Sequence, residues 1–536
     1  MKIAHYLVRR LESVGLRHMF NVPGDYTLAL LDYFLESKIE LIGTCNELNA
    51  AYAADGYARV KGIGAVCVTY CVGGLSALNG VAGSYAENVP VVVVTGGPSR
   101  AARAKGTMMH HSAGAPWSQL EAFRQFTVDA RIIADPVRAH RDVDEAISNC
   151  LRHKRPVYLE FPTDVLSLQC PEIEDLPPTA PLNDDATLKE ALDEATAMLT
   201  RARAPVLLSG AEVMRLHLED DVERLMRASG FPTGVGLMGK SSVNESDPRY
   251  FGLYMGGLSR EPVLKRIQES DAVLVVGGWL TDSTTGGFSY RIDENKTIAA
   301  NAGRVRIGHH VFEPVDLGAF VKGLTERFLE RSPLACGNET PDVFGSQPYV
   351  AREEPLTMRR FMERIQRLLS ERTMLVCDMC DGLFWSSELL IPRRGSFICQ
   401  GYYLSIGYGT PAALGVGIAA PEKLVIALVG DGGFQLTCQE FSTIVRTGAK
   451  AVVFVLNNDG YGVERIIHDG PYNEIAPWKY HRLTEVLGGH GFDVRTETEL
   501  ERAMAASEMP AVPRPGTAQG GARVAHVESS DPSRCW

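Results

Sequence analysis

Short runs of valine, isoleucine and leucine, each bounded by glycine and followed by a helix-like stretch, recur along most of the chain. Continuous apolar runs of this kind are typical of parallel strands that are covered by helices on both faces. Their alternation with helices predicts an α/β fold built from doubly wound parallel sheets. The predicted strands are residues 65–70, 89–97, 205–210, 271–278, 374–378, 424–430 and 451–458.

Two segments rich in proline and polar residues divide this pattern. They are residues 171–184 and 332–354, and we interpret both as linkers. A chain of 536 residues is expected to hold about three domains, at roughly 100–200 residues each. The predicted domains are 1–172, 185–335 and 355–536. The tail after about residue 509 is rich in proline and glycine and is expected to be irregular, with one last strand at 522–528.

Charge and hydropathy exclude several kinds of partner. The net charge is −11, from 54 basic and 65 acidic residues with no basic stripe, so we expect no nucleic-acid partner. The apolar runs are far shorter than the ~20 residues that cross a bilayer, and no membrane association is expected. The N-terminus has no apolar signal region, and eleven cysteines are scattered along the chain. These features predict a cytoplasmic protein with reduced thiols.

The most specific local pattern is a glycine-rich turn that ends a predicted strand. It comprises Gly430, Asp431, Gly432 and Gly433, and Asn458 follows 27 positions after Asp431, at the end of the next strand. A helix that starts at such a turn offers free N–H groups to a diphosphate. The Asp431 carboxylate, the Asn458 amide oxygen and the Gly460 carbonyl are the oxygen ligands that Mg²⁺ prefers. The alternative is two unrelated tight turns.

A second phosphate-type pattern needs a different interpretation. Residues 234–241 match G-x-x-x-x-G-K-S, the pattern of nucleotide-binding loops. Such a loop must open a helix, but the following residues, 241–250, include Asn, Ser, Asp and Pro248 and are poor helix formers. We therefore expect no ATP or GTP hydrolysis.

Several ionisable residues stand in distinctive surroundings. Glu47 leads an alanine-rich helical stretch, Asp25 lies in a turn after the first short strand, His110 and His111 follow a glycine-containing loop, and Glu464 follows the Asn458 turn closely. Taken singly, each is more typical of a solvated surface residue. As a set and in this order, however, they are similar to the catalytic residues of a known enzyme family.

The motifs at Glu47, Asp25, His110–His111, Glu464 and Asp431–Asn458 together resemble the thiamine-diphosphate-dependent 2-oxo-acid decarboxylases. The similarity is to the branch that contains pyruvate, indolepyruvate and phenylpyruvate decarboxylases. It implies pyrimidine-binding, central and diphosphate-binding domains, with thiamine diphosphate and Mg²⁺ as cofactors. The implied reaction is the non-oxidative conversion of a 2-oxo acid to an aldehyde and CO₂ through an ylide and an enamine.

The resemblance also assigns roles to residues. Glu47 is expected to meet the pyrimidine ring and activate the cofactor, while Asp25, His110, His111 and Glu464 transfer protons. In the segment 405–409, Ile406 is expected to wedge the cofactor into its bent shape, and the carbonyl of Leu404 to accept from the pyrimidine amine. The resemblance also implies that this chain forms an obligate homodimer with active sites at the interface, and pairs of dimers are common among relatives.

The residues that select the substrate follow the predicted strand 374–378. Pyruvate decarboxylases usually have Gly-Thr-Ser there, and Asp381 in place of the threonine looks more like phenylpyruvate decarboxylases. We therefore expect a preference for aromatic or branched 2-oxo acids. The candidates for lining the substrate pocket are Tyr26, Met379, Asp381, Phe384, Trp385 and Val463.

Two other functions remain open from the sequence. The first is an acyloin-forming carboligase of the acetolactate-synthase type, a branch that generally lacks the His-His pair and Glu464 and commonly uses a flavin. The predicted strand at 271–278 ends in Gly-Gly without G-x-G-x-x-G, so it carries no flavin fingerprint. The second is a homologue that binds the cofactor but is catalytically impaired.

Overall fold

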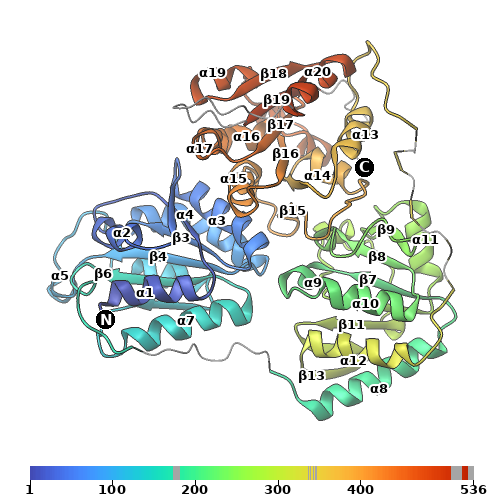
Figure 1. Cartoon of the computed structure of the whole chain (residues 1–536), viewed down its shortest axis with the longest axis horizontal. Helices are drawn as coiled ribbons and strands as arrows, with labels where there is room; N and C mark the ends of the chain where they lie inside the picture. Colours follow the sequence, from blue (N-terminus) through green and yellow to red (C-terminus); the bar gives the residue numbers. More distant parts are fainter. Residues whose placement is uncertain are drawn as a thin grey trace.

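Three separate sheets, each flanked by helices, form three lobes of the molecule (Figure 1). The computed structural model describes residues 1–172, 182–335, 337, 340–341, 343–344, 347–508 and 522–528. The α/β prediction is confirmed in all three lobes. Most of the linker expected at 171–184, and the tail expected to be irregular after about 509, lie outside the described residues, apart from 522–528.

The first sheet has the strand order β2-β1-β3-β4-β6-β5 and is parallel throughout. Its strands β3 and β4 are buried along their whole length, as their unbroken apolar sequences predict. The elements are α1 (Ile3–Ser13), β1 (His18–Asn21), α2 (Leu28–Leu35), β2 (Glu40–Gly43), α3 (Glu47–Lys61), β3 (Gly64–Val68), α4 (Val72–Ala86), β4 (Val91–Gly97), α5 (Arg100–Ala104), α6 (Ser118–Arg124), β5 (Asp129–Ile132), α7 (Ala139–His153) and β6 (Val157–Pro162).

The second sheet, of order β13-β12-β11-β10-β7-β8-β9, departs from the prediction at one edge. Strand β12 pairs antiparallel with both β11 and β13, so this sheet is mixed at that edge, while its other strands pair parallel as predicted. The elements are α8 (Asp185–Arg201), β7 (Pro205–Ser209), α9 (Ala211–Arg215), α10 (Glu219–Ser229), β8 (Thr233–Gly236), η1 (Leu237–Gly239), β9 (Tyr250–Tyr254), α11 (Glu261–Glu269), β10 (Ala272–Val276), η2 (Ser283–Thr285), η3 (Glu294–Lys296), β11 (Thr297–Asn301), β12 (Gly303–Ile307), β13 (His310–Val315) and α12 (Leu317–Leu329).

The third sheet, of order β15-β14-β16-β17-β19-β18, is parallel. The strand predicted at 522–528 is confirmed as β19, between β17 and β18. The elements are α13 (Met358–Leu368), β14 (Thr373–Cys377), α14 (Asp381–Ser386), β15 (Phe397–Cys399), α15 (Gly409–Ala419), β16 (Leu424–Gly430), α16 (Asp431–Thr437), η4 (Cys438–Glu440), α17 (Phe441–Thr447), β17 (Ala451–Asn457), α18 (Gly462–Ile467), η5 (Pro471–Asn473), η6 (Tyr480–Leu483), α19 (Thr484–Leu487), β18 (His490–Val494), α20 (Glu497–Glu508) and β19 (Arg523–Glu528).

Helices α3 and α15 join the first lobe to the third at very close range. A Cβ added at Gly56 would lie 2.6 Å from the Ala412 carbonyl oxygen, and one at Gly415 would lie 1.9 Å from that of Ala53. Only helices with small facing residues can approach this closely. The alanine-rich helix that begins at Glu47 is therefore fixed against the third lobe.

The segment that matches a nucleotide-binding loop does not have that structure. Lys240 follows the short helix η1, and its fully buried ammonium pairs with Glu245 at 3.1 Å and donates to the Leu389 carbonyl at 2.6 Å. The lysine is thus part of the packing between the second and third lobes. Within the described ranges, the helices all fall short of the length and apolarity that a membrane span requires.

Candidate active site

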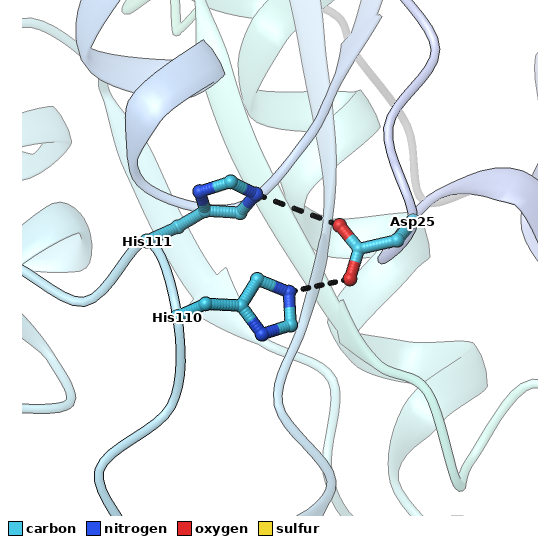
Figure 2. A group of neighbouring side chains, drawn as sticks. All are labelled: Asp25, His110 and His111. Atoms are coloured by element: carbon cyan, nitrogen blue, oxygen red, sulfur yellow. Dashed lines mark hydrogen bonds and ion pairs between the residues drawn. The ribbon is translucent and has the colours of Figure 1, made fainter.

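A carboxylate faces two neighbouring imidazoles at one end of the first sheet, with one oxygen directed at each ring (Figure 2). Asp25 follows β1, and its Oδ2 lies 2.5 Å from Nε2 of His110, while its Oδ1 lies 3.6 Å from Nε2 of His111. Both histidines come from the loop between α5 and α6. Partial desolvation opposes ionisation of Asp25, but the His110 hydrogen bond and the charges of the pair outweigh it and lower the pKa of Asp25. The structure thus brings together three residues that lie 85 and 86 positions apart.

The aromatic side chains of Tyr26 and Tyr70 pack beside this group. The Tyr26 side chain is buried, and its ring stacks on that of His110 with centroids 4.9 Å apart and planes 22° apart. Tyr70 packs edge-on to Tyr26 at 5.6 Å, and Cys71 and Met109 complete this apolar cluster. Burial raises the pKa of Tyr26, so its hydroxyl stays protonated at neutral pH. The proton-transfer candidates therefore border an apolar, aromatic surface.

Glu47 occupies the first position of α3. The helix is capped by Asn46, whose side chain accepts from the backbone N–H of Asn49. The Glu47 carboxylate is half-buried and has no hydrogen-bond or ion-pair partner among the residues that the structure describes. Its neighbour Asn49 donates to Glu440 of the third lobe at 2.8 Å. Glu47 is thus an available carboxylate on a helix that is anchored at its start.

Asp431 is buried at the junction of β16 and α16. Its Oδ1 accepts from the N–H of Gly432 and its Oδ2 from the N–H of Gly460, both at 2.8 Å. These contacts join the two glycine-containing turns whose pairing the sequence suggested. Burial, together with the nearby charge of Asp459, raises the pKa of Asp431 to about 6, although the backbone N–H groups of Gly432 and Gly460 oppose the shift.

The Asn458 side chain is oriented by a neighbour from a different strand. Its amide nitrogen donates to Oδ2 of Asp381 at 2.9 Å, and its Oδ1 is buried without a hydrogen-bond partner in the described residues. Arg465 holds the backbone of this turn, with donations to the carbonyls of Asn458 and Asp459 at 3.0 and 2.5 Å. The Gly460 carbonyl accepts from the N–H of Gly462 at 3.0 Å and keeps one lone pair available.

The three glycines around Asp431 have no room for side chains. A Cβ would lie 2.9 Å from the Cβ of Cys380 at Gly430, 2.5 Å from the Tyr461 ring at Gly432, and 2.9 Å from Oδ2 of Asp378 at Gly433. The turn therefore exposes backbone atoms without side chains at these three positions, as expected for a surface that a diphosphate approaches closely.

The turn 404–409 carries Leu404 and Ile406, both half-buried. Leu404 has φ +56°, a left-handed conformation that costs a leucine about 1–2 kcal/mol and that clusters at functional sites. Asp378, fully buried at the end of β14, holds the turn because its Oδ2 accepts from the N–H of Gly407 at 3.0 Å. Sequence reasoning missed Asp378, although a lone aspartate that directly follows a buried strand was a usable signal.

The remaining candidates divide between two places. Met379, Phe384 and Trp385 are partly buried and pack against the hydrophobic core between the second and third lobes. Val463 and Glu464 lie on α18, with Glu464 exposed. In the described chain, no hydrogen bond, ion pair or ring contact joins Glu464 to Asp25, His110 or His111.

The residues of the third lobe fit a diphosphate and its metal. Among the described residues, the Asp431 carboxylate is buried with N–H groups as its hydrogen-bond partners, the Asn458 amide oxygen is buried without a partner, and the turn carries no side chains at its glycines. These features are complementary to a divalent cation and phosphate oxygens. In the first lobe, Glu47 and the Asp25 group are the ionisable residues that can hold or move protons.

Comparison with known proteins gives the same class of enzyme. Three family models match: thiamine pyrophosphate enzyme, N-terminal TPP binding domain (residues 1–119), central domain (192–327) and C-terminal TPP binding domain (383–514). Thiamine pyrophosphate is another name for thiamine diphosphate. The fold and site thus define a thiamine-diphosphate enzyme, and the chain binds this cofactor.

Individual relatives show which group of thiamine-diphosphate enzymes the chain belongs to. Pyruvate decarboxylase 1 of Pisum sativum is 35% identical over 517 residues, which cover 94% of this chain and 87% of the relative. Pyruvate decarboxylase 1 of Oryza sativa subsp. indica is 36% identical, with coverages of 94% and 86%. An alpha-keto-acid decarboxylase of Mycolicibacterium paratuberculosis is 36% identical, with coverages of 94% and 91%. The chain belongs to the family of thiamine-diphosphate-dependent 2-oxo-acid decarboxylases, which confirms the resemblance drawn from its motifs.

Proposed function

We propose that this decarboxylase converts a 2-oxo acid with an aromatic or branched side chain to the aldehyde and CO₂, with Mg²⁺ bound beside thiamine diphosphate. The observation that carries the proposal is the Asp25 carboxylate paired with both His110 and His111, with the His110 ring stacked on the buried ring of Tyr26. When bound, thiamine diphosphate supplies the electron sink for loss of the carboxylate.

Proton transfer falls to residues of the first lobe and to Glu464. The separation of 2.5 Å between Nε2 of His110 and Oδ2 of Asp25 allows one proton to be held between them and passed to a substrate atom. His111, on the other carboxylate oxygen, holds Asp25 in place. Glu47, which has a carboxylate without a partner in the described chain, is the residue that holds a proton at the pyrimidine ring.

The third lobe holds the metal and the diphosphate. Asp431, Asn458 and the Gly460 carbonyl are the proposed Mg²⁺ ligands, since their oxygens are the hard donors that Mg²⁺ requires. The bare turn at Gly430, Gly432 and Gly433 receives the phosphates. Leu404 would hold the pyrimidine amine of the cofactor through its carbonyl, and Ile406 would support the cofactor from the same turn.

The proposed preference for bulky substrates rests on the buried aromatic rings of Tyr26 and Tyr70. The rings of Tyr26 and Tyr70 give an apolar side chain a surface beside the proton donors. Met379, Phe384, Trp385 and Val463 remain candidates for further pocket contacts. Asp381 stays a candidate as well, although its contact with Asn458 supports a role at the metal.

We also infer a homodimer with composite active sites, and a cytoplasmic location. Glu464 makes no contact with the Asp25 group within the described chain, although the proposed chemistry needs them together. A second copy that brings its third lobe to the first lobe would unite them. Dimers of this kind can pair into tetramers.

The test is a product screen with the protein loaded with Mg²⁺ and thiamine diphosphate. Pyruvate, a branched 2-oxo acid, indole-3-pyruvate and phenylpyruvate are supplied in turn, and CO₂, aldehyde and acyloin are measured. We expect CO₂ and aldehyde in equal amounts, with a higher kcat/KM for the bulky acids than for pyruvate. A main product of acyloin would instead indicate a carboligase, and no CO₂ from any acid would indicate a catalytically impaired homologue.

A further inference from the structure

A second group of metal-type ligands lies on the third sheet, in residues that the decarboxylase chemistry does not use. It consists of His481 from η6, Asp493 from β18 and His526 from β19, and one nitrogen or oxygen of each lies within 4.8 Å of the others. We propose that these three residues bind one transition-metal dication, Zn²⁺ by preference, at a site separate from Asp431 and Asn458.

The strand register places two of the ligands side by side. Asp493 and His526 are direct partners in the β18–β19 ladder, and Oδ1 of Asp493 lies 3.3 Å from Nδ1 of His526. Two ligands of a tetrahedral ion with bonds of about 2.0–2.1 Å stand about 3.4 Å apart. The pair thus already has the separation of two ligands on one zinc ion.

The third ligand is delivered by the short helix that covers these strands. The His481 and His526 rings lie nearly parallel, with planes 15° apart and centroids 6.2 Å apart. The helix can come this close because Gly491 has no side chain. A Cβ at that position would lie only 1.9 Å from the His481 carbonyl oxygen. Nδ1 of His481 is buried without a hydrogen-bond partner in the described residues, and one of its ring nitrogens lies within 4.8 Å of the ligand atoms of Asp493 and His526.

Neighbouring groups hold the ligands as outer-shell partners do at metal sites. Nε of Arg495 donates to Oδ2 of Asp493 at 3.3 Å, which leaves Oδ1 directed at His526. The Tyr480 ring packs edge-on to the buried His526 at 5.5 Å. The Asp493 side chain is 36% exposed, so a metal ion can enter from solvent and keep water as its fourth ligand.

The donor set selects the class of metal. Two imidazoles and one carboxylate suit Zn²⁺ and its neighbours Co²⁺, Ni²⁺ and Cu²⁺, whereas Mg²⁺ and Ca²⁺ prefer oxygen ligands throughout. The competing interpretation is an ordinary ion pair between a protonated His526 and Asp493. That pair needs no metal and needs no contribution from His481.

The experiment measures metal binding by the full chain after chelation, with Mg²⁺ and thiamine diphosphate restored. Zn²⁺ is titrated by calorimetry, and bound metal is counted by elemental analysis. His481→Gln and Asp493→Asn are expected to weaken Zn²⁺ binding by at least ~10-fold, because each removes one ligand. Both positions are partly exposed, and an unchanged cofactor-induced rise in Tm verifies the fold. His490→Gln, an exposed histidine on the same strand, is the matched control and should bind Zn²⁺ as the wild type does.

The Asp25 group also offers three metal-type ligands, so Asp25→Asn is included to separate the two sites. One Zn²⁺ per chain that survives Asp25→Asn but is lost in Asp493→Asn supports the proposal, as do visible Co²⁺ bands of four-coordinate type that disappear with His481→Gln. Zn²⁺ affinity and stoichiometry that are unchanged in both His481→Gln and Asp493→Asn overturn it.

Discussion

The amide nitrogen of Asn458 donates to the carboxylate of Asp381, and this one contact decides which way the amide faces. With the nitrogen engaged, Oδ1 is left buried and without a partner in the described chain, and so is available to the proposed cation. Asp381 lies 77 positions away in the sequence. If Asn458 is a ligand of Mg²⁺ as proposed, Asp381 acts on the metal through that ligand.

Removal of this acceptor should weaken Mg²⁺ binding. Residues that orient a metal ligand typically contribute about 10–100-fold in affinity, so we expect a loss of this size for Asp381→Ala in a Mg²⁺ titration with thiamine diphosphate present. Asp381→Asn keeps an acceptor oxygen and should restore most of the affinity. Equal Mg²⁺ affinity in the wild type and Asp381→Ala would show that Asn458 needs no such support.

Asp25→Asn tests the proton-transfer group. The substitution keeps the shape of the side chain but removes the charge that faces both imidazoles. General acid–base groups contribute about 10²–10⁴-fold, so kcat should fall by this amount while the affinity for thiamine diphosphate stays the same. Asp32→Asn, an exposed aspartate on α2, is the control and should leave kcat unchanged. A kcat within a few-fold of wild type in Asp25→Asn would contradict the assigned role.

Much of the fold followed from local patterns. The strand predicted at 424–430 coincides with β16, because a buried parallel strand is an unbroken apolar run that ends at glycine. The antiparallel β12 and β13 were missed for the converse reason. Their exposed positions interrupt the apolar pattern, as with Arg304 on β12 and His310 on β13, and such edge strands lack the signal of buried ones.

The site was predictable in its residue types but not in its contacts. The pairing of Asp431 with the Asn458 turn could be predicted, since parallel strands end at the same edge of a sheet. The support from Asp381 and Asp378 could not, because sequence spacing does not show which oxygen meets which N–H. Asp378 reaches Gly407 across 29 residues, and only the folded chain joins them.

Glu47→Gln should separate cofactor binding from turnover. Glutamine has nearly the same shape as glutamate, and α3 is anchored by Asn49 and Glu440 rather than by Glu47 itself. The affinity for thiamine diphosphate should therefore change little, while kcat falls by about 10²-fold or more, because glutamine cannot exchange a proton with the cofactor. Calorimetry gives the affinity for thiamine diphosphate, and a CO₂-release assay on the same preparation gives kcat. A parallel loss of affinity and kcat would assign Glu47 to binding instead.

Asp378 predicts a pH-dependent stability. Burial raises the pKa of this carboxyl to about 7, although several backbone N–H groups oppose the shift. Its ordinary value is about 3.9, so the folded chain holds a proton that the unfolded chain releases between about pH 4 and 7. The stability from this group is present at low pH and is lost as the pH rises through about 7.

Asp378→Asn removes this titration, and it also lowers Tm because an amide nitrogen cannot accept from the N–H of Gly407. The Tm advantage of the cofactor-free wild type over Asp378→Asn should therefore be greater at about pH 5 than at about pH 8.5. For Asp32→Asn, the difference in Tm from the wild type should vary little over the same range. A Tm advantage over Asp378→Asn that is constant with pH would mean that Asp378 stays ionised in the folded chain, with its backbone N–H partners outweighing the cost of burial.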